Sequence, residues 1–184
     1  MANSPTPAPG RYGVFLRGVN VGGINIKMAE LREALTTLPL GSFSTLLASG
    51  NIVCTADASA PELKAMMESL LRERFGYDAW VVVFSLGQLE SILDGFPYPA
   101  DSPELHSYVT LSSETGALDE LESLGRALDG TELARVAPLA LAWQAPVGGT
   151  LDSPFSKLTA KAKYKSTTTT RNVRTLVKVR EALA

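Results

Sequence analysis

The sequence predicts an α+β protein built from two ferredoxin-like (split βαβ) lobes with a cleft between them. The first observation behind this prediction is the order of apolar patterns in residues 11–97, which read strand, helix, strand, strand, helix, strand. The second is a weaker repeat of the same rhythm in residues 98–184. Residues 1–10 contain alternating prolines, so we expect a disordered lead-in before the N-terminal lobe.

The elements of the first lobe follow from apolar spacing and from helix caps. Apolar runs predict strands over residues 12–16, 43–48, 52–55 and 80–84. Leucine and methionine at helical spacing predict a helix from about Met28 and another that ends at Gly76. The pairs Ser59 with Glu62 and Ser85 with Gln88 are capping boxes, which place two helix starts.

The second lobe begins after the proline-rich break at residues 96–99. Strands are predicted over residues 106–111, 133–137 and 139–143, with a leucine-striped helix between the first two that ends at Gly130. Pro154 in a first-turn position predicts a further helix. A last helix is expected from about Arg171 to Leu183, capped by Thr169 or Thr170.

Composition restricts the function classes. The chain has no apolar run near the roughly 20 residues of a membrane span, and its start has no secretory pattern. Its one cysteine, Cys54, cannot form a disulfide within the chain, so we expect a cytoplasmic protein. One histidine and one cysteine are too few for the usual zinc ligands, so we expect no metal site and no cofactor. The sequence leaves the oligomeric state open.

Charge is distributed unevenly along the chain. Residues 1–155 hold 9 Lys and Arg against 18 Asp and Glu, whereas residues 156–184 hold 8 Lys and Arg against the single acid Glu181. Such a basic segment can bind phosphate or nucleic acid. It can equally pack on the acidic body of the protein, and the acidic overall balance favours this second interpretation over a nucleic-acid binder.

The glycine-rich stretch after the first strand is the leading candidate site. Arg17, Gly18, Asn20, Gly22 and Gly23 follow a strand, with Lys27 just before the next helix. Glycine allows close backbone approach, and arginine offers a bidentate fork, so an anion could bind there. A structural alternative, in which Arg17 pairs with a nearby carboxylate in a tight loop, stays equally open.

A second cluster lies late in the chain. Ser156 and Lys157 precede a run of hydroxyl residues that ends in Arg171 and Asn172. Hydroxyls before a helix are ordinary capping residues, but an added arginine and asparagine make an anion receptor. Cys54 in a strand pattern and His106 at a strand start are more typical of structural residues than of a nucleophile and its base.

Five short motifs together resemble one bacterial family, the domain of unknown function sixteen-ninety-seven. They are residues 16–23 (L-R-G-V-N-V-G-G), 27–32 (K-M-x-x-L-R), 49–51 (S-G-N), 156–158 (S-K-L) and 169–175 (T-T-R-N-x-x-T). The resemblance covers residues 11–184 and implies two ferredoxin-like halves but no activity. It also implies that the motif residues share a site: Arg17, Asn20, Lys27, Ser49, Asn51, Lys157, Arg171 and Asn172. Ala48 and Val173 depart from the family pattern, in which glutamine and tryptophan are typical.

Two functions follow as expectations. In the first, the cleft binds a phosphate-bearing or other anionic small molecule, or less readily a nucleic acid. In the second, the chain is an enzyme acting on such a ligand, with Lys27 or Lys157 stabilising charge. The sequence has no recognisable general base, which favours a binding protein over an enzyme. A third interpretation is that the motifs only hold loops and the lobe interface together.

Overall fold

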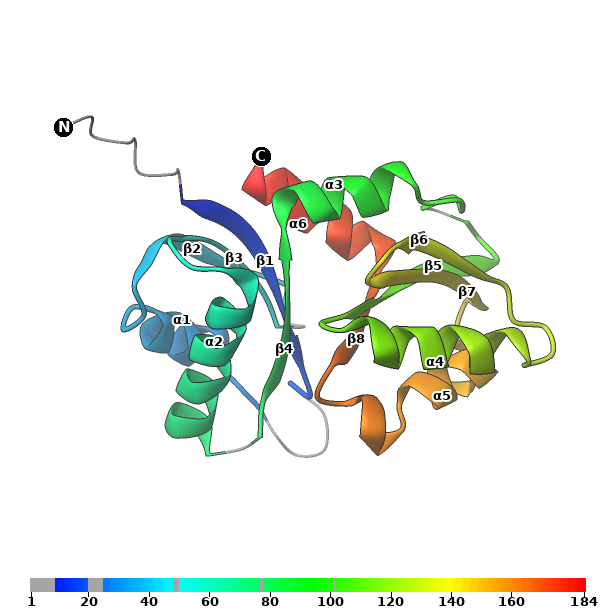
Figure 1. Cartoon of the computed structure of the whole chain (residues 1–184), viewed down its shortest axis with the longest axis horizontal. Helices are drawn as coiled ribbons and strands as arrows, with labels where there is room; N and C mark the ends of the chain where they lie inside the picture. Colours follow the sequence, from blue (N-terminus) through cyan, green and yellow to red (C-terminus); the bar gives the residue numbers. More distant parts are fainter. Residues whose placement is uncertain (1–8, 20–24, 48–49, 77, 101) are drawn as a thin grey trace.

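The computed structural model describes residues 9–19, 25–47, 50–76, 78–100 and 102–184. Within these ranges the chain is a mixed α+β structure with two four-stranded antiparallel sheets and six α-helices (Figure 1). The N-terminal half comprises β1 (Gly10–Arg17), α1 (Met28–Leu35), β2 (Leu40–Leu46), β3 (Asn51–Ala56), α2 (Ala60–Phe75), β4 (Trp80–Ser85) and α3 (Leu86–Asp94). The C-terminal half comprises β5 (Leu105–Ser112), α4 (Thr115–Arg126), β6 (Leu133–Ala137), β7 (Ala140–Pro146), α5 (Pro154–Thr159), β8 (Thr168–Asn172) and α6 (Val173–Leu183), with two short 3₁₀ turns, Thr150–Asp152 and Ala162–Tyr164.

The two sheets have the same connection pattern. The first has the strand order β2-β3-β1-β4 and the second β6-β7-β5-β8. In each, the first strand of the half lies inside the sheet and pairs with the third and fourth strands. The repeated pattern of strands and helices in the sequence therefore corresponds to two halves that share the same strand order.

The helix starts follow the local caps. Ser59 and Ser85 each accept a hydrogen bond from the backbone N–H three residues on, and Glu62 and Gln88 complete the two capping boxes. Gly76 ends α2 in the left-handed conformation, with φ of 68°. Because these signals act within one helical turn, the sequence was sufficient to place them.

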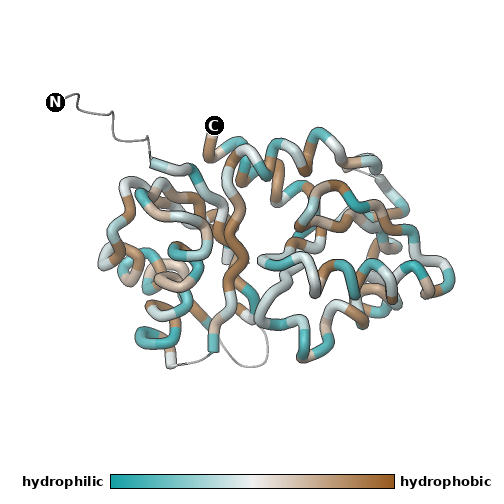
Figure 2. The backbone as a smooth tube through the Cα atoms, viewed as in Figure 1, coloured by the Kyte–Doolittle hydropathy of each residue, from teal (hydrophilic) through white to brown (hydrophobic). Residues whose placement is uncertain are grey.

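Three apolar cores hold the molecule together. One lies between the first sheet and α1 and α2, and another between the second sheet and α4 and α5. The middle core contains α3 and α6 and side chains from both sheets, including Phe15 and Val109. Apolar residues thus cover both faces of the first sheet, which explains why β4 is apolar along nearly its whole length (Figure 2).

Gly13 allows the C-terminal helix to approach β1 closely. A Cβ atom at Gly13 would lie 2.8 Å from Cγ1 of Val179 on α6 and 3.1 Å from Cδ1 of Leu89 on α3. The middle core is therefore packed down to the backbone of β1, so a larger side chain there would force the helices apart.

The threonine-rich stretch before the last helix corrects one expectation. Thr169 and Thr170 do not cap a helix, because residues Thr168–Asn172 form β8 and pair with β5. The cap of α6 is Asn172, whose side chain accepts a hydrogen bond from the N–H of Arg174. β-Branched threonines suit a strand once a partner is available, and that partner lies some 60 residues earlier in the chain.

Candidate functional site

Arg171 joins the two halves from the C-terminal side. Its Nε donates to Oδ1 of Asn51 at 2.7 Å and its Nη2 to the carbonyl oxygen of Leu16 at 2.5 Å. The guanidinium also lies 5.7 Å from the ring centre of Phe15 in the middle core. Burial, together with the nearby positive charge of Arg17, lowers the pKa of Arg171 to about 10.

Arg17 makes the reciprocal connection from the end of β1. Its Nη1 donates to the carbonyl oxygen and the hydroxyl of Thr168, at 2.5 and 2.8 Å, and its Nη2 donates to the carbonyl oxygen of Thr159 at 2.9 Å. Burial lowers the pKa of this guanidinium as well. The structural alternative from the sequence had Arg17 pairing with a nearby carboxylate; in the described residues its partners are neutral oxygens of the other half instead.

The turn at Gly50 brings the S-G-N motif to the same place. Gly50 has φ of 73°, and a Cβ there would lie 3.0 Å from Cβ of Leu16. The N–H of Leu16 donates to the carbonyl oxygen of Gly50 at 2.8 Å. Asn51 is fully buried and donates from Nδ2 to the carbonyl oxygen of Leu46. Three motifs that are distant in the sequence therefore meet at one seam between the halves.

Other residues that the sequence selected lie apart from this seam or outside the described ranges. Lys27 is exposed before α1 and pairs with Glu30 at 3.5 Å. Lys157 is exposed on α5, where its Nζ lies 3.9 Å from Asp152, and the N–H of Ser156 donates to Oγ of Ser153. The four remaining residues, Asn20, Gly22, Gly23 and Ser49, lie outside the residues that the structure describes, while Gly18 directly follows Arg17 with φ of 80°.

A cavity of about 400 Å³ opens at the seam, where β8 passes into α6. Among the described residues, the N-terminal half contributes Leu47 to it, and the C-terminal half contributes His106, Tyr108, Asn172, Arg174, Thr175 and Lys178. Asn172, which follows Arg171 directly, connects the cavity to the arginine contacts. Of the residues selected from the sequence for the site, Asn172 lines this cavity.

The lining charge of this cavity is positive. Arg174 and Lys178 are exposed, and their spacing of four residues puts them on one face of α6. In the part of the chain that the structure describes, Lys178 has no ion-pair partner, and no carboxylate is among the lining residues. An anion entering the cavity would meet two cationic side chains together with the amide of Asn172 and the hydroxyl of Thr175.

Two other cavities are less suited to binding a charged ligand. One of about 410 Å³ lies between α3 and the β6–β7 hairpin, and the described residues that line it, Phe84 and Pro138 among them, carry no charge. One of about 320 Å³ is lined by Arg11, which already donates to the carbonyl oxygens of Leu183 and Ala184. The cavity beside α6 is thus the best candidate for binding a charged ligand.

Sequence reasoning did not select most of the lining residues, among them Arg174, Lys178 and His106. Arg174 and Lys178 had a readable signal, because they lie four residues apart on the helix that follows the T-x-R-N motif. His106 had none beyond being the single histidine; in the fold its Nδ1 lies 3.4 Å from the hydroxyl of Tyr108. Among the described residues, no helix has the length and apolar character to cross a membrane, and no three His, Cys, Asp or Glu side chains group as metal ligands.

Comparisons with known proteins give a family and a fold. The family model described as a protein of unknown function (DUF1697) matches residues 10–139. The solved structure of the conserved bacterial protein SP0830 from Streptococcus pneumoniae is similar at 25% identity and a TM-score of 0.79, over 96% of this chain and 100% of that one. An unknown protein from Galdieria sulphuraria aligns at 12% identity over 89% of this chain and 96% of its own, with a TM-score of only 0.25. No curated protein matches the chain.

Proposed function

The chain belongs to the DUF1697 family of proteins of unknown function, and because that membership brings no activity, we propose from its own geometry that it binds a phosphate-bearing small molecule. The site is the cavity at the seam between the halves. Arg174 and Lys178 supply the charge, and Asn172 and Thr175 supply hydrogen bonds that fix the anion's orientation.

One observation carries this proposal: the cavity has a volume suited to a small ligand, and its described charged lining is entirely cationic. An isolated exposed lysine or arginine is unremarkable. Two of them on one helix face, beside an asparagine and a threonine in a concave site, are a suitable receptor for a phosphate dianion.

Arg171 and Arg17 act in this proposal as positioning residues. Their guanidinium groups hold β8 against the ends of β1 and β3, which fixes the β8–α6 junction where Asn172 lies. Their positive charges also favour an anion nearby, because salt screens the charge of a buried arginine less than that of an exposed one. Asn51 supports the same arrangement by accepting from Arg171.

The shared strand order supports assigning each half to the ferredoxin-like class. On that assignment, the cavity is the part of the inter-lobe cleft that α3 and α6 leave unfilled. The middle core makes the two halves one packed unit, so we expect the ligand to enter a largely preformed site.

A thermal-shift panel at low and moderate salt tests the proposal. It contains inorganic phosphate, nucleotides, sugar phosphates, and short RNA and DNA, with wild type, Arg174→Ala, Lys178→Ala and the double variant. Stabilisation by a small phosphate that falls in each single variant and is lost in the double one supports the site. Lys161→Ala removes another exposed lysine, outside the cavity, and should leave the shift unchanged.

Two outcomes of the panel would overturn the proposal. One is stabilisation that survives in the double variant. The other is stabilisation by oligonucleotides alone that disappears with salt, which would indicate nucleic-acid backbone binding through the basic segment.

An enzyme acting on such a ligand is the second candidate, and the observation that favours it is His106 in the cavity lining beside Tyr108. A histidine can serve as general acid or base near neutral pH. Incubation of the bound phosphate ester with wild type and His106→Ala, followed by phosphorus NMR, separates the candidates. Turnover that is lost in His106→Ala while binding persists would establish the enzyme.

A further inference from the structure

We infer that the cavity selects a phosphate monoester whose organic part is a planar ring, rather than inorganic phosphate or an aliphatic phosphate. This inference rests on the proposed function, because the phosphate is held by Arg174 and Lys178. It goes further in assigning a second, ring-binding part of the cavity to Tyr108, His106 and Leu47.

The aromatic wall of the cavity is rigid. The ring of Tyr108 stacks on Trp143, with centroids 4.8 Å apart and an angle of 27° between planes. Trp143 is only 1% exposed and packs edge-on against Phe155, so it supports Tyr108 from the core. The hydroxyl of Tyr108 is held at 2.8 Å from Oγ1 of Thr150. A wall fixed in this way offers a ring contact without a loss of side-chain freedom on binding.

His106 extends the aromatic surface. Its ring centre lies 6.3 Å from that of Tyr108, at an angle of 75°. Two aromatic rings at a steep angle give a corner into which a flat group can fit with one stacked and one edge contact. A glycerol moiety has no ring face to use such a corner.

Leu47 supplies an apolar contact from the other half of the chain. Its side chain is 45% exposed although it lines the cavity, and its φ of 58° makes it the one non-glycine residue with positive φ among those described. Asparagine adopts this conformation more readily than leucine, so local backbone energy does not explain a leucine here. We attribute the choice of leucine to an apolar ligand surface that packs on it.

The dimensions agree with a ring and a phosphate together. A cavity of about 400 Å³ is larger than one phosphate ion needs and lies within the range of small-molecule sites. The charged residues of α6 and the aromatic residues of β5 line one cavity, so a single ligand can contact both sets.

Calorimetric titration with three phosphates of similar charge tests the inference. We expect phenyl phosphate to bind about tenfold or more tightly than glycerol 2-phosphate and inorganic phosphate, since a buried ring face removes apolar area from water. Leu47→Asn should reduce the advantage of phenyl phosphate several-fold and leave the affinity for inorganic phosphate unchanged. Because asparagine tolerates positive φ, this variant should melt no lower than wild type.

Two controls separate the possible failures. Lys178→Ala should weaken all three phosphates, whereas Leu124→Asn, which changes an exposed leucine on α4 outside the cavity, should weaken none. If no phosphate binds, the proposed function itself fails. If all three bind equally, or Leu47→Asn leaves the preference intact, the phosphate site stands and the ring-binding inference is wrong.

Discussion

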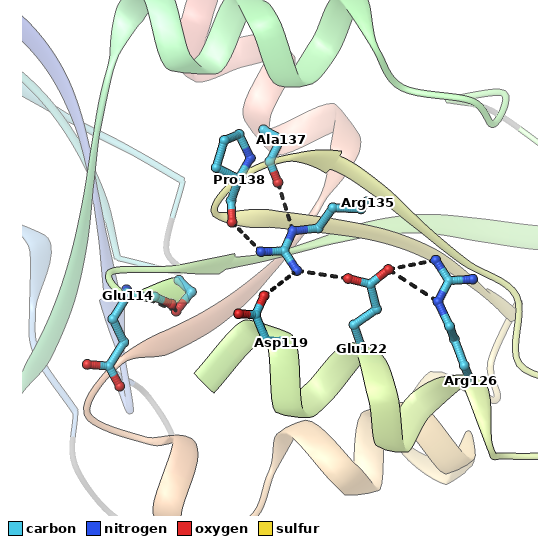
Figure 3. Close-up of polar contacts among 8 residues, drawn as sticks. Glu114, Asp119, Glu122, Arg126, Arg135, Ala137 and Pro138 are labelled. Atoms are coloured by element: carbon cyan, nitrogen blue, oxygen red, sulfur yellow. Dashed lines mark hydrogen bonds and ion pairs between the residues drawn. The ribbon is translucent and has the colours of Figure 1, made fainter. Parts of the chain in front are cut away.

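Two groups of arginines in this molecule have opposite electrostatic surroundings. In the C-terminal half, Arg135 lies between Asp119 and Glu122, with Nη1 at 3.0 and 2.8 Å from their carboxylates (Figure 3). Glu122 also pairs with Arg126 at 2.6 Å. At the seam, Arg17 and Arg171 donate, among the described residues, to carbonyl, hydroxyl and amide oxygens.

A charge cluster with its own carboxylates therefore differs from the seam, beside which we propose that an anion binds. The cluster around Arg135 neutralises itself and ties α4 to the β6–β7 hairpin, where Arg135 also donates to the carbonyl oxygens of Ala137 and Pro138. The described partners of the seam arginines are oxygens of carbonyl, hydroxyl and amide groups. The seam lies beside a cavity that itself carries Arg174 and Lys178.

The largest expected effect is at Arg171. Arg171→Met should lower the free energy of unfolding by about 3–5 kcal/mol, because several charged hydrogen bonds are lost at a buried position. Urea unfolding measures the change. Arg171→Lys retains the charge but not the fork, so it should recover only a small part of the loss. Near-wild-type stability in Arg171→Lys would contradict the importance of the forked hydrogen bonds.

Arg17→Ala should lower the free energy of unfolding by about 1–3 kcal/mol, because the carbonyl of Thr159 is left without its donor. The effect should be smaller than at Arg171, because the side chain of Arg17 is less buried. Hydrogen exchange should increase in residues 159–168, which Arg17 holds. Arg11→Ala is the matched control: it also removes an arginine that donates to carbonyl oxygens, but at an exposed chain end, and should cost less. Unchanged exchange in that segment would argue against a connecting role for Arg17.

Arg135→Met should cost about 1–2 kcal/mol at neutral pH, and this cost should depend on pH. The hydrogen bond from Arg126, and then that from Arg135, holds the pKa of Glu122 below its usual 4.5. A carboxylate with a lowered folded-state pKa stabilises the fold above its unfolded pKa, and that stabilisation is lost as pH falls through the folded value. The cost of Arg135→Met should therefore shrink below pH 4.5, as urea titrations from pH 7 to 3.5 would measure.

The same titration on Arg17→Ala sharpens the comparison. Its described partners are neutral oxygens, so its cost should stay constant over this pH range. A parallel decrease in both variants would remove the distinction between the two groups of arginines.

The smallest effect is expected at Arg126, which is more than half exposed. Arg126→Ala should cost about 0.3–0.5 kcal/mol, the value typical of an i,i+4 pair on a helix. Raising the salt concentration should reduce the difference from wild type, which thermal unfolding at two ionic strengths can measure. A cost that is insensitive to salt would indicate that Arg126 acts by packing instead.

The sequence by itself determined the elements whose signals are local. The two capping boxes, the proline at the start of α5 and the glycine at the end of α2 each act within one turn of helix, so the residues involved are neighbours in the chain. The motif resemblance, over residues 11–184, also identified the family, whose model matches residues 10–139. Of the motif residues that the resemblance implies to share a site, Arg17, Asn51 and Arg171 lie at the seam, whereas Lys27 and Lys157 lie apart from it.

Only the tertiary structure decided what these residues contact. The partners that Arg171 and Arg17 have in the other half lie 120 to 155 residues away in the chain, and no spacing rule reaches that far. The sequence predicts Thr169 or Thr170 as a helix cap, because β5, the strand that pairs with them, lies some 60 residues earlier in the chain. The cavity arose in the same way: Leu47, His106 and Lys178 become neighbours only when the middle core packs α6 between the two sheets, since burial of apolar surface, and not local propensity, brings those segments together.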